Sequence, residues 1–244
     1  MAKVVFNVSK NKLNYSQRNN NFVFKHGAAE IKNSTMCNVT SMCMALDYAG
    51  YQFPTGLSTQ PEDNLADFLV NDSKVDAFYK EKMPAMYAAY KAGKEGCYPP
   101  NEVHEVLAYG TNLWMGTTAV NFSTNVKISD IKKQLLIEGR PVVMSGLFNN
   151  LHHVVCLVGL TFEVPDNVLK FSYARQIKYI SDNKIPPSEI IIDDPWGNPL
   201  KDYKEGISGN DIKLPWSFFI NNMKPLGNAT VKWAHMINEA AAVV

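Results

Sequence analysis

The chain has 244 residues, of which 46% are hydrophobic, so it is long enough for one large domain or two small ones with a sizeable core. Its formal net charge is +1, and its Lys and Arg residues are scattered, which argues against nucleic acid or an anionic membrane surface as a partner. Four cysteines are too few for a disulfide framework, no apolar run reaches the roughly 18 residues of a membrane helix, and the first residues lack the pattern of a secretory signal. We therefore expect synthesis in a reducing compartment.

The N-terminal part of the chain is expected to be mostly irregular until a helix begins at a cysteine. Residues 1–36 are polar and irregular in pattern, whereas apolar side chains recur over residues 37–49 at the spacing of one helix face. Thr35 or a neighbour is placed to cap this helix, and Gly50 to end it. The sequence therefore predicts a helix that Cys37 opens.

Helices are expected to continue through the first half of the chain, and strands to follow. The predicted helices are 62–70, 74–92 with a break at Pro84, 101–109 with Asn101 as a cap, and 130–138 with Ser129 as a cap. The predicted strands are 141–147, 153–160 and 189–193, all of them β-branched runs of the kind buried on both faces of a sheet. Residues 233–244 are amphipathic to apolar and could be a docking helix, a partner contact or a bilayer-seeking tail, of which packing on the core as a terminal helix is favoured. Because helices precede strands, the sequence predicts an α+β fold rather than alternating α/β.

Cys37 is the strongest candidate for a reactive residue. Most intracellular cysteines are buried and structural, but a thiol at a helix N-terminus lies in the positive end of the helix dipole, which favours the thiolate. Small polar neighbours such as Asn38 add to this indication. Cys43 and Cys156 lie in apolar runs and are expected in the core, and Cys97 is expected in a loop.

Two adjacent histidines and two adjacent aspartates are candidates for the partners of that thiol. His152 and His153 start a predicted strand on opposite faces, so only one of them can face the cysteine helix, and periodicity does not choose between them. Asp194 precedes a proline and could be a simple turn residue, or it could orient an imidazole, as could Asp193 from the other face. Cysteine, then histidine, then aspartate is the chain order of papain-like nucleophilic catalysis.

A metal site is the main chemical alternative. His104, His152, His153, Asp193 and Asp194 could in principle gather a zinc ion. The chain has no His-Glu-x-x-His and no Cys-x-x-Cys, and adjacent pairs on a strand diverge rather than converge on one ion. It also has no phosphate-binding Gly-rich motif, so neither zinc nor nucleotide chemistry is favoured.

Together these segments resemble the double-glycine type of papain-like cysteine peptidases, a group that includes bacteriocin-leader-processing proteases and cell-wall hydrolases of bacteriophages. The segment from Cys37 to Leu46 resembles the catalytic helix of that group. Gly159 follows His153 by six residues, as in the histidine strand of the group, so the resemblance selects His153 over His152. The segment Asp-Asp-Pro-Trp-Gly resembles the third catalytic segment and selects Asp194.

The resemblance also points to an oxyanion-stabilising residue. The segment around Gln17 is similar to the one that carries the oxyanion-hole glutamine, although it lies farther from Cys37 than is common, and Asn33 is an alternative donor. After the cysteine the group usually has Gly-Pro, whereas this chain has Asn38-Val39, which is closer to the phage cell-wall branch.

We expect a single papain-like peptidase domain over residues 1–244, with an N-terminal catalytic helix packed on a C-terminal antiparallel sheet and long insertions near 51–128 and 161–188. The second insertion is expected to be a lid, a hairpin or a loose loop. The resemblance implies Cys37, His153 and Asp194 as catalytic residues, with no metal and no organic cofactor.

The implied substrate is a peptide, with peptidoglycan peptide as the leading class, and we expect a monomer. Such a phage-type lysin would be made in the host cytoplasm without a signal peptide and would act at the cell wall or periplasm. Two alternatives stay open: a protease that processes a protein or leader peptide, and a papain-fold binding or structural protein without activity.

Overall fold

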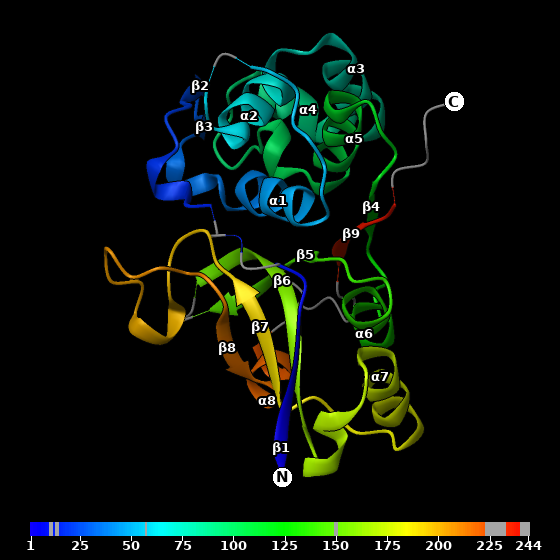
Figure 1. The fold of residues 1–244 in the computed structure, drawn as a ribbon. Helices are drawn as coiled ribbons and strands as arrows, with labels where there is room; N and C mark the ends of the chain where they lie inside the picture. Colours follow the sequence, from blue (N-terminus) through cyan, green and yellow to red (C-terminus); the bar gives the residue numbers. More distant parts are fainter. Residues whose placement is uncertain (10–11, 13–14, 57, 149–150, 223–232, 240–244) are drawn as a thin grey trace.

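A computed structural model of the chain describes residues 1–9, 12, 15–56, 58–148, 151–222 and 233–239. Its helices are α1 (Cys37–Tyr48), α2 (Pro61–Asn71), α3 (Ser73–Lys82), α4 (Pro84–Lys91), α5 (His104–Met115), α6 (Ile128–Leu136), α7 (Tyr173–Asp182) and α8 (Trp216–Asn222). Helices α1 to α5 form a helical half, and the main sheet with α6, α7 and α8 forms a second half (Figure 1). The predicted α+β class is confirmed.

The main sheet is antiparallel at every pairing between its described strands. Its strands are β1 (Ala2–Asn7), β4 (Val120–Ser123), β5 (Val142–Phe148), β6 (Leu151–Val164), β7 (Glu189–Asp193), β8 (Ile212–Pro215) and β9 (Ala234–Ile237). The order is β4-β9-β5-β6-β7-β8, with β1 paired to the second part of β6. The long strand β6 is thus the centre of the sheet, with β5 and β7 beside it. A separate hairpin, β2 (Phe24–His26) and β3 (Ala29–Ile31), lies on the helical half.

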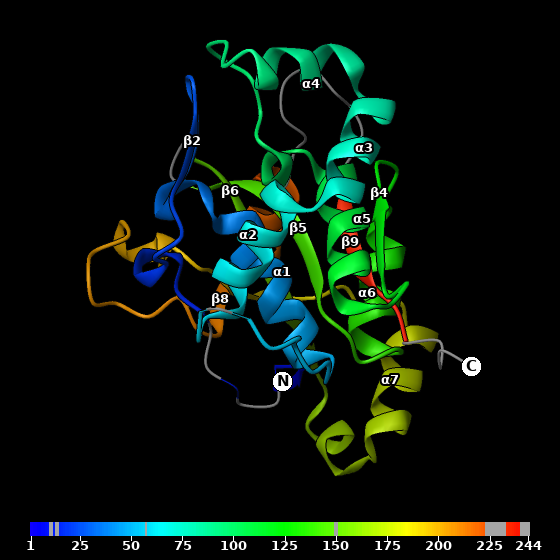
Figure 2. The ribbon, with the colours of Figure 1, turned by 90° about the horizontal axis from the view of Figure 1, so that it is seen from above.

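Helix α1 lies at the junction of the two halves and packs on β5 and β6 (Figures 1 and 2). It is buried almost all round rather than on the one face that its apolar spacing predicts. Its polar residues Asn38, Thr40 and Ser41 are buried too, and each bonds to a neighbouring element. A helix that is enclosed in this way is held at a fixed position relative to the sheet.

The structure contradicts three predictions about segments, two of which concern strands that pair with partners distant in the chain. The first residues are not irregular, since residues 2–7 form β1 against β6. The C-terminal segment is not a helix over its described part, since residues 234–237 form β9 between β4 and β5. The stretch 161–188 is neither a lid, a hairpin nor a loose loop, since it completes β6 and then forms α7. Residues 240–244 lie outside the described part.

Three predicted helix caps are also wrong. Thr35 accepts a hydrogen bond from the main-chain N–H of Lys32 and does not cap α1, which starts after Met36 without a side-chain cap. Asn101 lies before α5 and is buried against α1, and Ser129 lies inside α6. The break at Pro84 is confirmed, because α3 ends at Lys82 and α4 begins at the proline.

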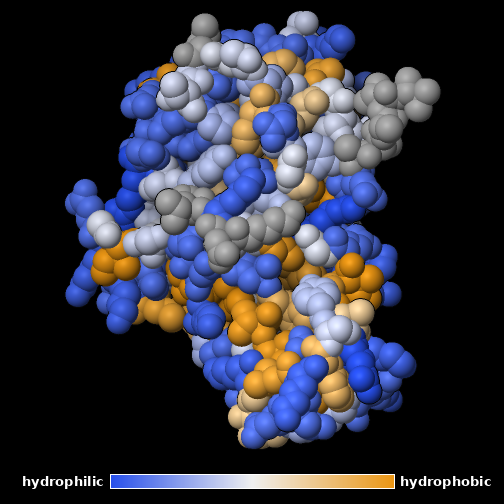
Figure 3. Space-filling model, in the orientation of Figure 1, coloured by the Kyte–Doolittle hydropathy of each residue, from blue (hydrophilic) through white to orange (hydrophobic). Residues whose placement is uncertain are grey.

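Polar and apolar surfaces are unevenly divided between the two halves. On the face in Figure 3 the helical half is mostly hydrophilic, whereas apolar side chains gather over the sheet half. Val5 on β1 and Tyr173 on α7 are among its exposed large apolar residues. Among the described residues, no helix combines the length and the apolar character that a membrane span needs.

The presence of glycine at position 159 of β6 has a steric explanation. A Cβ at Gly159 would lie 2.2 Å from the main-chain oxygen of Phe6 and 3.1 Å from Asn7 Cα, both on β1. The pairing of β6 with β7 shifts register at this point, between Leu157 and Gly159. Glycine therefore lets β1 approach the strand that carries His153.

We predict that Gly159→Ala lowers the free energy of unfolding by about 1–3 kcal/mol, because the added methyl group must push β1 away. Urea unfolding followed by circular dichroism measures this. Ser181→Ala, at an exposed position of α7, is the control and should match the wild type. Equal stability of Gly159→Ala and the wild type would contradict the steric reason given for this glycine.

Candidate active site

Cys37 is the first residue of α1 and is half-buried. The helix is fixed to the sheet one turn later, where Ser41 Oγ donates a hydrogen bond to the main-chain oxygen of Val154, at 3.0 Å. Val154 follows His153 on β6. The bond therefore sets the distance between the start of the helix and the histidine.

His153 and Asp194 form a buried pair. His153 is the third residue of β6 and 4% exposed, and Asp194 directly follows β7 and is fully buried. The two strands are neighbours, with Cys156 opposite Asp193. His153 Nε2 lies 2.7 Å from Asp194 Oδ1. A bond at Nε2 leaves Nδ1 of the ring for a second partner.

The Cys37 thiol also interacts with the His153 side chain, by a hydrogen bond and by charge. Burial acts to lower the pKa of His153, but the charge and hydrogen bond of Asp194, together with Cys37, outweigh it and raise the pKa to about 10. His153 is therefore an imidazolium at neutral pH. The Cys37 thiol therefore lies next to a cation, at the N-terminus of a helix.

The Asp194 carboxylate has further hydrogen bonds. Its Oδ1 accepts from the main-chain N–H of Trp196 at 2.8 Å, and its Oδ2 accepts from the hydroxyl of Tyr203 at 3.2 Å. Its own main-chain N–H donates to the oxygen of Gly209. A fully buried carboxylate needs such donors because it has lost its water.

The alternative histidine and aspartate lie elsewhere. His152 is exposed, on the other face of the strand from His153. Asp193 points away, to the Tyr48 hydroxyl at 2.6 Å and the main-chain N–H of Asp211 at 2.6 Å, and burial raises its pKa to about 6. The geometry thus brings together Cys37, His153 and Asp194, the three residues that the sequence predicts. Their catalytic roles stay a prediction.

Gln17 is hydrogen-bonded to the turn that leads to the cysteine helix. It is 1% exposed and belongs to a short 3-10 helix, η1 (Gln17–Asn19). Its Nε2 donates to the main-chain oxygen of Asn33 at 2.8 Å, and its main-chain N–H donates to that of Pro195 at 2.9 Å. An amide nitrogen carries two hydrogens, so one stays available. Asn33 itself is exposed and contributes its main-chain oxygen here, which favours Gln17 as the side-chain donor.

The remaining cysteines and histidines are apart from this site. Cys43 and Cys156 are fully buried, as predicted, and burial raises the pKa of both thiols well above the usual value. His104 Nδ1 lies 3.0 Å from His235 Nε2, and burial lowers the pKa of His104 to about 4. Across the described part of the chain, no three His, Cys, Asp or Glu side chains gather in a way that could hold a metal ion.

Sequence reasoning missed two residues next to the site, Tyr203 and Arg18, and it named Asn38 without predicting its contact. Asn38 donates through its side chain to the main-chain oxygen of Asn101, which ties the start of α1 to the helical half. Tyr203 contacts the aspartate from a loop nine residues on, and Arg18 holds that loop. The sequence offers no motif for Tyr203 or for Arg18, whose contacts with Trp196 and Tyr203 join distant segments.

A cysteine at the head of a helix, packed on an antiparallel sheet that carries histidine and aspartate, is the arrangement of a papain-like cysteine peptidase. The model of the Peptidase_C39 like family matches residues 11–216, and the chain belongs to this family of cysteine peptidases. A search of curated proteins finds no match to the chain.

We predict that iodoacetamide at about pH 6 alkylates Cys37 well before Cys43 and Cys156, because only Cys37 combines access with an adjacent imidazolium. Peptide mass spectrometry over a time course gives the rate for each thiol. Cys97 is an internal control, because it is half-buried like Cys37. If Cys37 is alkylated faster than Cys97, access alone does not explain the difference. Equal, slow labelling of all four thiols would contradict an activated Cys37.

Proposed function

We propose that this cysteine peptidase hydrolyses amide bonds through Cys37 as nucleophile, His153 as general acid and base, and Asp194 as the residue that orients the imidazole. The observation that carries the proposal is the continuous hydrogen-bonded arrangement from Asp194 through His153 to Cys37. The order of these three residues along the chain, and their position between a helix and a sheet, agree with the papain-like peptidases that the sequence resembles.

In the acylation step the Cys37 thiolate attacks the carbonyl carbon of the scissile amide. The oxyanion that forms accepts hydrogen bonds from the main-chain N–H of Cys37 and from Gln17 Nε2. The first N–H groups of a helix have no partner within the helix, so that of Cys37 can serve the substrate. A donor of this kind typically contributes about 3 kcal/mol to the transition state. His153 then gives its proton to the leaving amine, and a thioester remains on Cys37.

In the deacylation step neutral His153 takes a proton from water, and the hydroxide formed attacks the thioester carbonyl. Collapse releases the acid product and the thiolate, and His153 is again an imidazolium. Asp194 holds the orientation of the ring and stabilises its charged form. The protein side chains supply every proton transfer, so the proposal needs no metal and no organic cofactor.

We propose peptidoglycan peptide as the substrate class. The support is the Asn38-Val39 sequence after the nucleophile, in which the chain resembles the phage cell-wall branch. Asn38 is buried and bonded to Asn101, so the residue that departs from the usual glycine has a structural partner in this chain. A lysin of this type would act at the cell wall or periplasm after synthesis in the host cytoplasm, and as a monomer.

Digestion of purified peptidoglycan by the wild type and by Cys37→Ala tests the proposal, with the products identified by mass spectrometry. New peptide amino termini that the variant does not produce would establish an endopeptidase. Separated glycan and stem peptide would establish an amidase. Cys97→Ala removes a half-buried thiol away from the site and should keep the activity.

Two other outcomes would contradict the peptidoglycan proposal. Cleavage of casein without products from peptidoglycan would favour a protease that acts on proteins or leader peptides. No cleavage of either substrate, with Cys37 unreactive, would favour a papain-fold protein without activity.

The raised pKa of His153 predicts a pH dependence. Since the imidazolium donates the proton to the leaving group, kcat/KM should fall as the pH rises through about 10. Asp194→Asn removes the main contribution that raises this pKa, so the fall should move to lower pH by at least about one unit. We expect the maximal rate of the variant to drop about 10²-fold or more. An unchanged alkaline limb in Asp194→Asn would contradict the role given to Asp194.

A further inference from the structure

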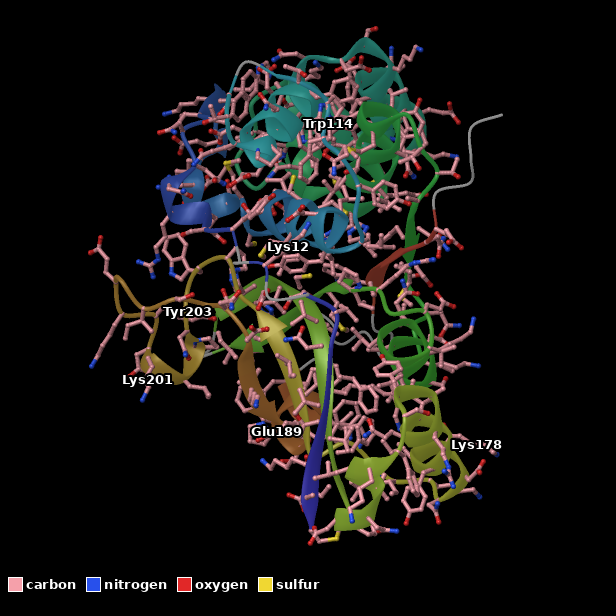
Figure 4. The ribbon with its side chains drawn as sticks, in the orientation of Figure 1. Lys12, Trp114, Lys178, Glu189, Lys201 and Tyr203 are labelled. Carbon is pink, nitrogen blue, oxygen red and sulfur yellow. The ribbon has the colours of Figure 1, made fainter. Side chains whose placement is uncertain are left out.

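Tyr203 occupies an unusual position in the loop between β7 and β8. This loop contains a short 3-10 helix, η5 (Pro199–Lys201), followed by Asp202 and Tyr203, whose φ values are 52° and 55°. Two successive residues other than glycine in the left-handed region are unfavourable, and such strain gathers at functional sites. Figure 4 shows Tyr203 beside the sheet and Lys201 on the outer side of the loop.

The side chain of Tyr203 contacts both members of the buried pair. Its hydroxyl donates to Asp194 Oδ2 at 3.2 Å, and its ring meets the His153 ring edge-on, with centroids 6.0 Å apart and an interplanar angle of 81°. Burial, followed by the charges of Asp194 and Cys37, raises the pKa of Tyr203, so the hydroxyl keeps its proton and acts as the donor.

The main chain of Tyr203 is held on both sides. Its N–H donates to the oxygen of Asn198 at 3.1 Å, and its oxygen accepts from Arg18 Nη2 at 2.7 Å. Arg18 also donates through Nε to the oxygen of Trp196 at 2.7 Å, and its guanidinium lies 4.4 Å from the centre of the Trp196 ring. The residue next to Gln17 thus fixes the loop that presents Tyr203.

Tyr203 is half-buried, whereas Asp194 is fully buried and His153 is 4% exposed. The tyrosine ring therefore lies between the pair and the solvent on this side. Water that reached the pair would weaken the attraction between carboxylate and imidazolium, because the interaction depends on a low local dielectric constant.

We propose that Tyr203 is a positioning residue of this site, which covers the Asp194–His153 pair from water with its ring and is held there by its hydrogen bond to Asp194. The inference rests on the proposed roles of Cys37, His153 and Asp194. It adds that a strained tyrosine, which none of the sequence motifs described above includes, helps to set the pH at which the imidazole loses its proton.

The test is the pH dependence of Cys37 alkylation by iodoacetate, which needs no knowledge of the substrate. This reagent is an anion and is attracted by the imidazolium, so its rate should fall as His153 loses its proton. The rate is measured from pH 6 to 11 for the wild type, Tyr203→Leu and Tyr203→Phe. The same two changes at Tyr87, whose hydroxyl donates to Asp76 at 2.8 Å on the helical half, are the controls.

For Tyr203→Leu we expect the midpoint of the fall to move by about one unit, because water that reaches the pair changes both the burial of the imidazole and its attraction to Asp194, the two opposing effects on its pKa. Tyr203→Phe keeps the ring and should show a smaller shift, and both Tyr87 variants should match the wild type. Tyr203→Phe also keeps the test decisive if the leucine variant does not fold.

Two results would overturn the inference. One is a midpoint in Tyr203→Leu equal to that of the wild type, with only the melting temperature lowered, which would leave Tyr203 a structural residue. The other is a shift in Tyr203→Phe as large as in Tyr203→Leu, which would show that the ring does not provide the cover. Failure of the proposed function would be seen in the wild type itself, as a rate without any fall at alkaline pH.

Discussion

The hydrogen bond between His153 and Asp194 is the interaction on which the site depends. Removing a carboxylate and an imidazolium from water is costly unless both are paired and further hydrogen-bonded. Here the cost is offset by the 2.7 Å bond between them and by donors from Trp196 and Tyr203 to the carboxylate. The sheet holds the pair in place, because His153 lies on β6 and Asp194 follows the adjacent strand β7.

The position of the nucleophile relative to this pair is set by buried polar contacts of α1. Ser41 bonds to β6, Thr40 accepts from Asn20, and Asn38 bonds to the main chain at Asn101. These side chains connect the helix to the sheet, to the N-terminal segment and to the helical half. Buried hydrogen bonds of this kind select one orientation, whereas apolar packing alone would allow small rotations of the helix.

The elements with strong local patterns could be predicted from the sequence. The α1 helix, the break at Pro84 and strands β5 and β7 agree with the expected bounds to within one or two residues. Strands β1 and β9 could not be predicted, because each is short and exists through pairing with β6 or β5, far away in the sequence. Helix α7 was missed because it follows a strand that runs on past its predicted end.

The residues of the candidate site also divide into those that a local sequence pattern predicts and those that it does not. The position of Gly159 in the sequence selects His153 over His152. The structure gives the physical reason for this glycine, since a larger residue would prevent β1 from lying against β6 there. The parts of the site that a motif does not carry, Tyr203 and Arg18, were not predicted. The contacts of Arg18 join segments more than 170 residues apart, and no local pattern indicates them.

The most direct test of the account is the titration of the His153 imidazole in the intact protein, followed by nuclear magnetic resonance of labelled histidine and assigned by the loss of its signal in His153→Gln. The account predicts that this ring stays protonated at neutral pH and loses its proton at about pH 10, because Asp194 and Cys37 outweigh the effect of burial. Loss of the proton near pH 6.5, which is about the pKa of an unperturbed histidine, would contradict the account.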